Sequence, residues 1–417
     1  MCCRDVFLGV VKKGLDMFSF DILGEDEKAR AGNLVTSHGS IKTPSFVSVG
    51  TLASVNPLSV EELMNIGTQA IIANAFHLHL QPGEDVINRR GGLHAFMRWN
   101  GPLITDSGGF QAFSLGVGKE ARPGKITSMF NDKKFNRPGV HIEKNKPFIS
   151  VDEDGIKFLS YIDGSEQSYT PEHIINIEKK LGADIIMILD ECTSPFHDYH
   201  YTKEAMARTQ RWSLRALEEF KRASPDGQAL FGIVQGGIFK GLRLEGARFL
   251  SEQNFSGYAI GGFLGESKKG MHDILDLVMP LLKKDKPRHL LGIGEIDDIF
   301  EIVGRGIDLF DCIFPTKLAK TGTVLTKEGK RYRIHLLNSA YRYDTRPIDE
   351  SCKCYTCMNY SKGYINHLFK IKDPFAVRLA SIHNLSFIES LMRQIRVAIM
   401  EKRFSELKRE WLWDNSN

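Results

Sequence analysis

The sequence has no apolar run that approaches the length of a membrane-spanning helix. Residues 7–11, the apolar stretch near the N-terminus, are too few for the core of a signal peptide and run into Lys12 and Lys13. The formal net charge of +4 is too small to identify a polyanionic partner by itself. We therefore expect a cytoplasmic protein with no membrane partner, whose cysteines stay reduced.

Cysteine is scarce, since only seven occur in 417 residues, and this odd number does not fit a disulfide framework. Three of them are clustered at Cys352, Cys354 and Cys357, and His383 follows later in the chain. Three thiolates and one imidazole make up the four ligands of a closed, structural zinc site. His367 is an alternative fourth ligand, although its aromatic neighbours are better suited to a partner surface. We expect one structural zinc ion and no catalysis at this metal.

Two further signatures are missing. No Gly-rich phosphate-binding fingerprint follows the first predicted strand, which disfavours a dinucleotide-binding doubly wound sheet. Neither a Ser-His-Asp order nor a His-rich metal cage occurs at the ends of the predicted strands, so the site has no obvious basis for serine-hydrolase or catalytic-metal chemistry. The length of 417 residues leaves room for one large α/β barrel or for two ordinary domains.

Short apolar strands alternate with amphipathic helices along most of the chain. This alternation predicts a parallel sheet with right-handed crossovers. Eight strands favour a (β/α)8 TIM barrel, with an open doubly wound sheet as the alternative. The predicted strands are 45–49, 70–76, 102–105, 184–189, 230–234, 257–260, 289–293 and 309–314. The predicted helices between them are 59–66, 171–181, 203–222, 242–252, 271–283 and 296–303.

Other segments interrupt this alternation. Residues 17–43 are predicted to form a hairpin-like cap over the closed end of the barrel. Residues 116–146, rich in Gly, Pro and Lys, are predicted to form an exposed insertion. No closing helix is predicted directly after the eighth strand, and the closing amphipathic helix is predicted only at 385–399. The predicted units are a barrel (1–316), an inserted zinc-binding subdomain (317–384) and a closing helix with a helical tail (385–417).

Polar residues and glycine pairs follow the predicted strands. In residues 103–111 (LITDSGGFQ) an apolar run stops at Asp106, and Gly108 and Gly109 then allow a sharp turn and the close approach of a ligand. Because the strands of a parallel barrel share one carboxyl end, where active sites lie, we expect these side chains to converge on one cavity. The other strand-end residues are Asp190, Glu191, Gln235, Gly261, Gly262, Glu266, Glu295 and Asp311.

The chemistry of this set is that of carboxylates and amides. Several carboxylates in one cavity cannot all ionise at ordinary pKa values, so one can donate a proton while another attacks. A single Asp is usually a helix cap, but caps would not repeatedly be accompanied by glycine pairs and a Gln. The set suits glycosyl transfer or recognition of a purine edge. Cys192 and Cys312, beside strand ends, are expected to be packed hydrophobic residues.

Basic residues precede the cysteine motif. They fit a track for a phosphate backbone and fit a solvated face equally well, so charge alone does not choose between the two. They are Lys317, Lys320, Lys327, Lys330, Arg331, Arg333, Arg342 and Arg346.

Six features in order resemble the tRNA-guanine transglycosylase family, bacterial type, over essentially the whole chain. They are 105–111 (TDSGGFQ), 189–193 (LDECT), 232–237 (GIVQGG), 258–262 (YAIGG), 310–316 (FDCIFPT) and the Cys and His set. The resemblance implies a (β/α)8 barrel with an inserted structural zinc site, usually dimeric, here a homodimer. It also implies exchange of the wobble guanine of certain tRNA anticodons for a 7-substituted 7-deazaguanine, in queuosine modification.

The resemblance also implies a role for each strand-end residue. The catalytic pair is Asp311, the nucleophile at the ribose C1′, and Asp106, the general acid/base. The other implied contacts are Asp190, Gln235, Gly262 and Glu266 for the base, Ser107 and Asn74 for the ribose, and Lys317 and Lys320 for the RNA. The family has Arg at these last two places, and Lys keeps the charge but loses the bidentate contact.

The chain departs from bacterial relatives in the loop 261–266 (GGFLGE), which is one residue shorter. Bacterial members with Val in this loop take a small aminomethyl base, and eukaryotic members with Gly take the bulkier queuine. Gly265 therefore predicts that queuine is accepted. Two rival hypotheses are a non-catalytic tRNA-binding subunit of the same family and a barrel hydrolase acting on a small nucleoside. The first would lack the nucleophile, and the second would need neither the zinc motif nor the basic track.

Overall fold

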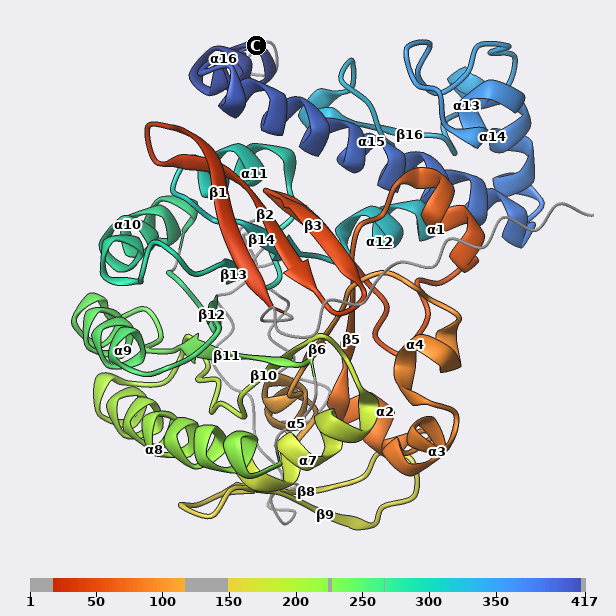
Figure 1. The fold of residues 1–417 in the computed structure, drawn as a ribbon. Helices are drawn as coiled ribbons and strands as arrows, with labels where there is room; N and C mark the ends of the chain where they lie inside the picture. The colour runs from red at the N-terminus through yellow and green to blue at the C-terminus, as the bar shows by residue number, and fades with distance from the viewer. Residues whose placement is uncertain (1–17, 117–148, 224–226, 266, 414–417) are drawn as a thin grey trace, which may run out of the picture.

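The structure is a computed structural model that describes residues 18–116, 149–223, 227–265 and 267–413. Eight parallel strands close into a barrel in the order β10-β11-β12-β13-β14-β4-β5-β6 (Figure 1). They are β4 (Ser45–Val49), β5 (Ile71–Asn74), β6 (Leu103–Asp106), β10 (Ile185–Met187), β11 (Ala229–Val234), β12 (Gly257–Ile260), β13 (Arg288–Leu290) and β14 (Leu309–Asp311). The predicted (β/α)8 barrel is confirmed, and the open sheet is excluded. Of the predicted insertion, 117–146 lie outside the described residues, as does Glu266.

Several barrel strands are shorter than predicted. Strand β5 ends at Asn74 because α2 (Ala75–Leu80) begins there, with the Asn74 side chain accepting a hydrogen bond from the backbone N–H of His77. Strand β14 ends at Asp311, and α12 (Phe314–Lys320) follows almost at once. A short helix that the sequence analysis did not predict therefore follows the eighth strand, and it takes up residue 314, which was predicted as strand. Pro315 favours this helix because its fixed φ suits the first turn, where no N–H is needed.

Helices cover the outside of the barrel (Figure 1). Helix α1 begins with a capping box formed by Ser59 and Glu62, and α7 begins with Thr170 as its N-cap and a proline in its first turn. Among the described residues, no helix has both the length and the apolar character needed to cross a membrane. The helices of this layer are α1 (Val60–Ile66), α3 (Glu84–Arg89), α4 (Gly92–Met97), α5 (Gly109–Gly116), α7 (Pro171–Leu181), α8 (Tyr199–Ala223), α9 (Lys240–Glu252), α10 (Lys268–Val278), η2 (Met279–Leu281) and α11 (Ile296–Val303).

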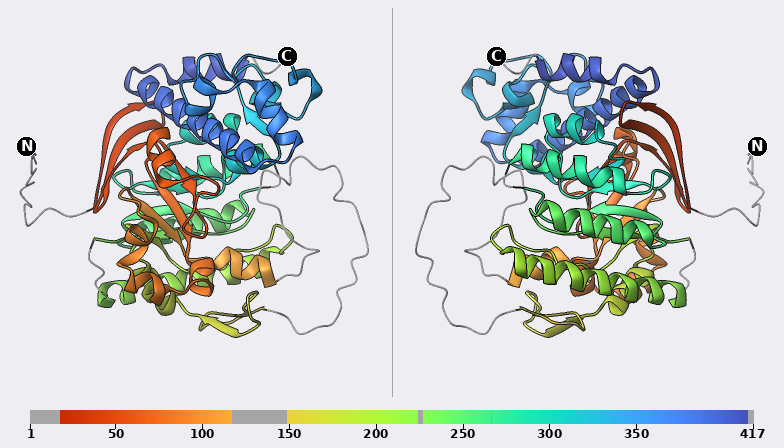
Figure 2. Two further views of the ribbon diagram at one scale, coloured as in Figure 1. Left: turned by 90° about the vertical axis from the view of Figure 1, so that its right-hand side faces the viewer. Right: turned by 90° about the vertical axis from the view of Figure 1, so that its left-hand side faces the viewer.

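An antiparallel sheet of β1 (Ser19–Asp26), β2 (Ala29–Thr36) and β3 (Gly39–Thr43) stands at the amino ends of the barrel strands (Figure 2). Its Arg30 is buried and donates to both carboxylate oxygens of Asp308, directly before β14. The same guanidinium donates to the carbonyls of Lys284 and Lys286, which precede β13. The sheet therefore covers the end of the barrel opposite to the carboxyl ends of its strands.

A second antiparallel sheet follows α5. It consists of β7 (Ile149–Val151), β8 (Ile156–Leu159) and β9 (Glu166–Tyr169). Tyr169 is fully buried and packs edge-on against Phe158 at 4.9 Å and near Phe76 of α2 at 6.2 Å. These rings hold the small sheet against the helix that follows β5.

The chain after α12 forms a layer beside the barrel (Figure 1). Helix α15 spans 374–400 and packs against α12, β1, β2 and β4, so the helix predicted at 385–399 is present but starts earlier. Asn384 explains the longer helix, because its buried amide donates to the carbonyls of Pro315 and Thr323 and accepts from the N–H of Leu325. The elements here are β15 (Thr323–Leu325), η3 (Lys330–Tyr332), β16 (Arg333–His335), η4 (Ser339–Tyr341), α13 (Tyr355–Asn359), α14 (Lys362–Lys370), α15 (Pro374–Met400) and α16 (Phe404–Trp413).

Candidate active site and metal centre

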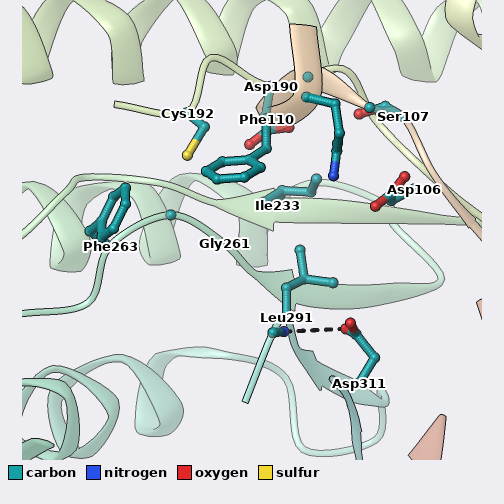
Figure 3. A pocket seen from close by; sticks show the side chains of 15 residues that line it. Asp106, Ser107, Phe110, Asp190, Cys192, Ile233, Gly261, Phe263, Leu291 and Asp311 are labelled. Carbon is teal, nitrogen blue, oxygen red and sulfur yellow. Dashed lines mark hydrogen bonds between the residues drawn. The ribbon is translucent and has the colours of Figure 1, made fainter. Parts of the chain in front are cut away.

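A pocket opens at the carboxyl ends of the barrel strands, as expected from the strand-end residues (Figure 3). Asp106 and Asp311, which are far apart in the sequence, both line it, and so do Asp190, Ser107 and Gly262. The remaining lining residues are Gly108, Gly109, Phe110, Gln111, Cys192, Ile233, Gly261, Phe263, Leu291 and Gly292. The pocket therefore combines three carboxylates with apolar walls.

Asp106 is held by the neighbouring strand. Asn74 lies opposite it in the β5–β6 register and donates its side-chain N–H to Asp106 Oδ1. The predicted ribose neighbour Asn74 thus contacts the predicted general acid/base directly. Gly108 has φ +79°, and a Cβ there would lie 2.2 Å from the Cβ of Phe76, so this turn requires glycine.

Asp311 is almost fully buried at the end of β14. Its Oδ1 lies 3.1 Å from Nε2 of His289. The same oxygen accepts a hydrogen bond from the backbone N–H of Gly292 at 3.3 Å (Figure 3). Both partners come from β13 and the turn after it. One carboxylate oxygen is therefore fixed by two groups of the adjacent strand.

Asp190 is buried beside the pocket, and its Oδ2 accepts a hydrogen bond from Nε2 of Gln235. Burial, assisted by the charge of Glu191, raises the pKa of Asp190 to about 6, although the bond from Gln235 opposes this shift. Gln235 does not line the pocket itself and contacts it through Asp190. Glu191 points elsewhere, since it pairs with Arg208 and accepts from the hydroxyl of Tyr201 at 2.8 Å.

Arg243, which the sequence did not single out, supports the glycine loop of the pocket. The buried guanidinium donates to the carbonyls of Val234 at 2.8 Å, Gly237 at 2.8 Å, Gly261 at 2.9 Å and Phe263 at 3.0 Å. Burial lowers its pKa to about 10. The ends of β11 and β12 are tied together by one side chain.

Sequence reasoning missed other parts of the site. Phe110 lies inside the quoted 103–111 motif and Phe263 follows the glycine pair, so aromatic residues beside these motifs were an available signal. His289 carried a weaker signal, as a lone polar residue at the start of an apolar strand. Burial raises the pKa of the Cys192 thiol, which agrees with a packed, unreactive cysteine.

The predicted metal ligands come together beside α15. The ligating atoms of Cys352, Cys354, Cys357 and His383 all lie within 4.8 Å of one another. Nδ1 of His383 is 3.2 Å from Sγ of Cys357, while its Nε2 lies 2.6 Å from the carbonyl oxygen of Leu325, which fixes the ring. These donors fit a tetrahedral zinc ion. His367 is not part of this cluster.

Lys317 and Lys320 are both exposed on α12, the helix that follows Asp311. Glu295 lies in a different setting, because it is buried and pairs with Lys268 at 3.3 Å, Arg333 at 3.5 Å and Arg331 at 3.6 Å. The strand-end carboxylates among the described residues therefore divide into three that line the pocket and two, Glu191 and Glu295, that pair with cations.

Comparison with known proteins agrees with this geometry. The sequence profile of the family described as Queuine tRNA-ribosyltransferase matches residues 26–417. The Queuine tRNA-ribosyltransferase of Roseiflexus sp. (strain RS-1) is 45% identical over 408 residues, which cover 94% of this chain and 99% of the relative. The Putative queuine tRNA-ribosyltransferase of Archaeoglobus fulgidus is 43% identical, with 93% and 97% covered. The chain therefore belongs to the queuine tRNA-ribosyltransferase family, a family of pentosyltransferases.

Proposed function

We propose that this chain exchanges the wobble guanine of tRNA anticodons for a 7-substituted 7-deazaguanine, as a step of queuosine modification. The observation that carries the proposal is the meeting of Asp106 and Asp311 in one pocket, with the buried Asp190 beside them. Both carboxylates that the family resemblance assigns to catalysis are present in the chain. This argues against a non-catalytic tRNA-binding subunit.

The exchange is a double displacement at the ribose C1′. Asp311 attacks C1′ and forms an ester while the C1′–N9 bond breaks, and the departing guanine takes a proton from Asp106. The incoming base then gives its N9 proton to Asp106 and attacks C1′, and the ester bond breaks with its electron pair returning to Asp311. Two inversions at one carbon give net retention, as in retaining glycosidases. The target base must leave the anticodon stack to reach the pocket.

The base is read by its hydrogen-bonding edge. An ionised Asp190, oriented by the amide of Gln235, accepts N–H groups of a purine, and the N–H of Gly262 serves its O6. A Cβ at Gly262 would lie 2.6 Å from Oε1 of Gln235, so only glycine allows the loop to approach this closely. Ser107, buried next to Asp106, faces the ribose in this proposal, and Glu266 is a further base contact.

Exposed groups suggest the partners. Lys317 and Lys320 fit contacts with the phosphates of an anticodon loop, consistent with the tRNA named for the relatives. A face of large side chains on α13 and α14 includes the exposed Tyr355, Met358 and Tyr364, and supports a homodimer. A cytoplasmic location matches a tRNA substrate.

The Cys3His cluster is proposed to bind one structural zinc ion, because its four protein donors leave no open position for catalysis. A second apolar core supports the inserted subdomain 317–384 between the barrel (1–316) and the closing segment (385–417). This core is formed by Ala319, Val324, Leu336, Ile348, Cys357, Ile365, Leu368, Ala376, Leu379 and Ala380. The metal thus stabilises the part of the chain that carries the basic and aromatic surfaces.

The covalent step is tested with Asp311→Asn. Wild-type protein mixed with tRNA and guanine should give an adduct that survives denaturing electrophoresis, and should incorporate radiolabelled guanine. Asp311→Asn should give no adduct and should slow incorporation by about 10⁴-fold or more, because the nucleophile is lost. Asp85→Asn, on an exposed α3 side chain, is the control and should behave as wild type. An adduct in Asp311→Asn would contradict the proposal, and hydrolysis of free guanosine by the wild type would favour the nucleoside hydrolase.

Base recognition by Asp190 should depend on pH. Its pKa of about 6 lies above the ordinary value because of burial, so the carboxyl group is ionised at pH 7 and largely protonated at pH 5. Protonation removes an acceptor for the purine N–H groups, so KM for guanine should rise about tenfold from pH 7 to pH 5 and stay nearly flat above pH 7. Exchange kinetics between pH 5 and 8 measure this. The step should vanish in Asp190→Asn, and a flat wild-type profile would refute the assignment.

The incoming base is tested by competition. Gly265 has φ +150°, and a Cβ there would lie 2.8 Å from the backbone of Gly270, so glycine lets the loop lie against the start of α10. Because the resemblance associates Gly in this loop with members that take the bulkier base, we expect queuine to displace radiolabelled guanine from tRNA. Displacement by the aminomethyl base alone would end this part of the proposal.

The metal is tested by elemental analysis. Wild-type protein should contain one zinc per chain, and His383→Ala or Cys352→Ser should lose it and unfold at a lower temperature, since metal binding contributes to folding. His367→Ala is the matched control and should keep the zinc. Zinc retained in His383→Ala together with loss in His367→Ala would reassign the fourth ligand.

A further inference from the structure

A buried histidine lies against the nucleophile of the proposed reaction. His289 is the middle residue of β13 and is fully buried. Its Nε2 is 3.1 Å from Oδ1 of Asp311, and the N–H of Gly292 reaches the same oxygen at 3.3 Å. Both groups act on one oxygen of the carboxylate.

The surroundings of the imidazole fix its proton. Nδ1 of His289 is buried and finds no hydrogen-bond partner within the part of the chain that the structure describes. A doubly protonated ring would bury an N–H donor and a positive charge without an acceptor at Nδ1, which is costly. A ring protonated only at Nδ1 would turn a lone pair toward the carboxylate oxygen. The neutral form with its proton on Nε2 avoids both, so His289 donates to Asp311.

We propose that His289 is a positioning residue that holds Oδ1 of Asp311 and sets the balance between the free carboxylate and the covalent ribosyl ester. This rests on the proposed base exchange with Asp311 as nucleophile. With Oδ1 engaged by the Nε2–H of His289 and the N–H of Gly292, Oδ2 forms the bond to C1′, and the C1′–N9 bond breaks with its electron pair leaving on guanine. Oδ1 then becomes the carbonyl oxygen of the ester.

The sign of the effect follows from hydrogen-bond strength. A donor binds a charged carboxylate oxygen more strongly than the neutral carbonyl oxygen of an ester. His289 therefore stabilises the free enzyme relative to the covalent intermediate, and it assists the second step, in which Asp311 is the leaving group. The residue prevents the chain from stalling as an adduct with tRNA.

The experiment compares His289→Phe, which removes the donor, with His289→Gln, whose side-chain N–H can replace Nε2–H. Each protein is mixed with tRNA over a range of guanine concentrations, and the denaturation-resistant adduct is quantified. Free guanine attacks the adduct and releases tRNA from the enzyme. The guanine concentration that halves the amount of adduct therefore reports the equilibrium between the covalent intermediate and the free enzyme. For His289→Phe this concentration should rise about tenfold while exchange at saturating guanine slows about tenfold. His289→Gln should stay within about threefold of wild type.

A merely structural role would lower adduct and exchange together, because fewer molecules would be active, and would leave the guanine midpoint unchanged. That result would overturn the inference, and so would equal midpoints in His289→Phe and His289→Gln. His289→Leu is a second donorless variant should the phenylalanine not fold, and melting temperature and zinc content monitor folding. If the wild type itself forms no adduct and exchanges no guanine, the proposed function fails. If the wild type exchanges guanine normally but substitutions of His289 do not move the guanine midpoint, only the role of His289 fails.

Discussion

Pairing of the last barrel strand with the first is the constraint on which the site depends. In the β14–β4 register Asp311 lies opposite Val47, which closes the sheet and turns the carboxyl ends of all eight strands to one rim. The opposite end is closed by Arg30 and Asp308, both buried, with Asp308 also accepting from the N–H of Arg288. A buried pair of this kind costs several kcal/mol to break, because the remaining charge has no partner. Strand β14 is thus anchored at one end and functional at the other.

The carboxylates that pair with cations and the carboxylates that line the pocket have different kinds of partner. Asp308, Glu191 and Glu295 each bind a guanidinium or ammonium group, and none of them lines the pocket. The pocket carboxylates each receive a neutral donor: the amide of Asn74 on Asp106, the amide of Gln235 on Asp190, and the backbone N–H of Gly292 on Asp311. A neutral donor orients a carboxylate without adding an opposite charge. These donors therefore orient the groups to which the proposed reaction assigns proton transfer, base recognition and attack.

Much of this arrangement could be predicted from the sequence, because strand ends in a parallel barrel are marked by where apolar runs stop. The strands, the convergence of residues 106, 190 and 311, and the Cys3His cluster followed from such local patterns. Helix α12 and the early start of α15 did not, since Pro315 resembles a breaker, and Ser381, His383 and Asn384 interrupt the apolar periodicity although all are buried. The polar groups of His383 and Asn384 are satisfied by residues distant in sequence, such as Leu325, which no local pattern reveals.

The site residues that sequence analysis missed also depend on contacts with residues distant in sequence. Arg243 and His289 act through atoms of neighbouring strands, and their effect depends on the register between those strands rather than on their own sequence context. Burial among four carbonyls lowers the pKa of the Arg243 guanidinium, but the same contacts hold the carboxyl ends of β11 and β12 together. Gly261 and Gly262 can therefore approach Gln235, while the guanidinium itself stays outside the pocket lining. The charge of Arg243 is kept behind the walls of the pocket, and the described lining presents carboxylates, backbone, an amide and apolar side chains. For a reaction in which a carboxylate attacks and must later leave, this separation is favourable, because a cation inside the pocket would bind Asp311 too tightly for attack.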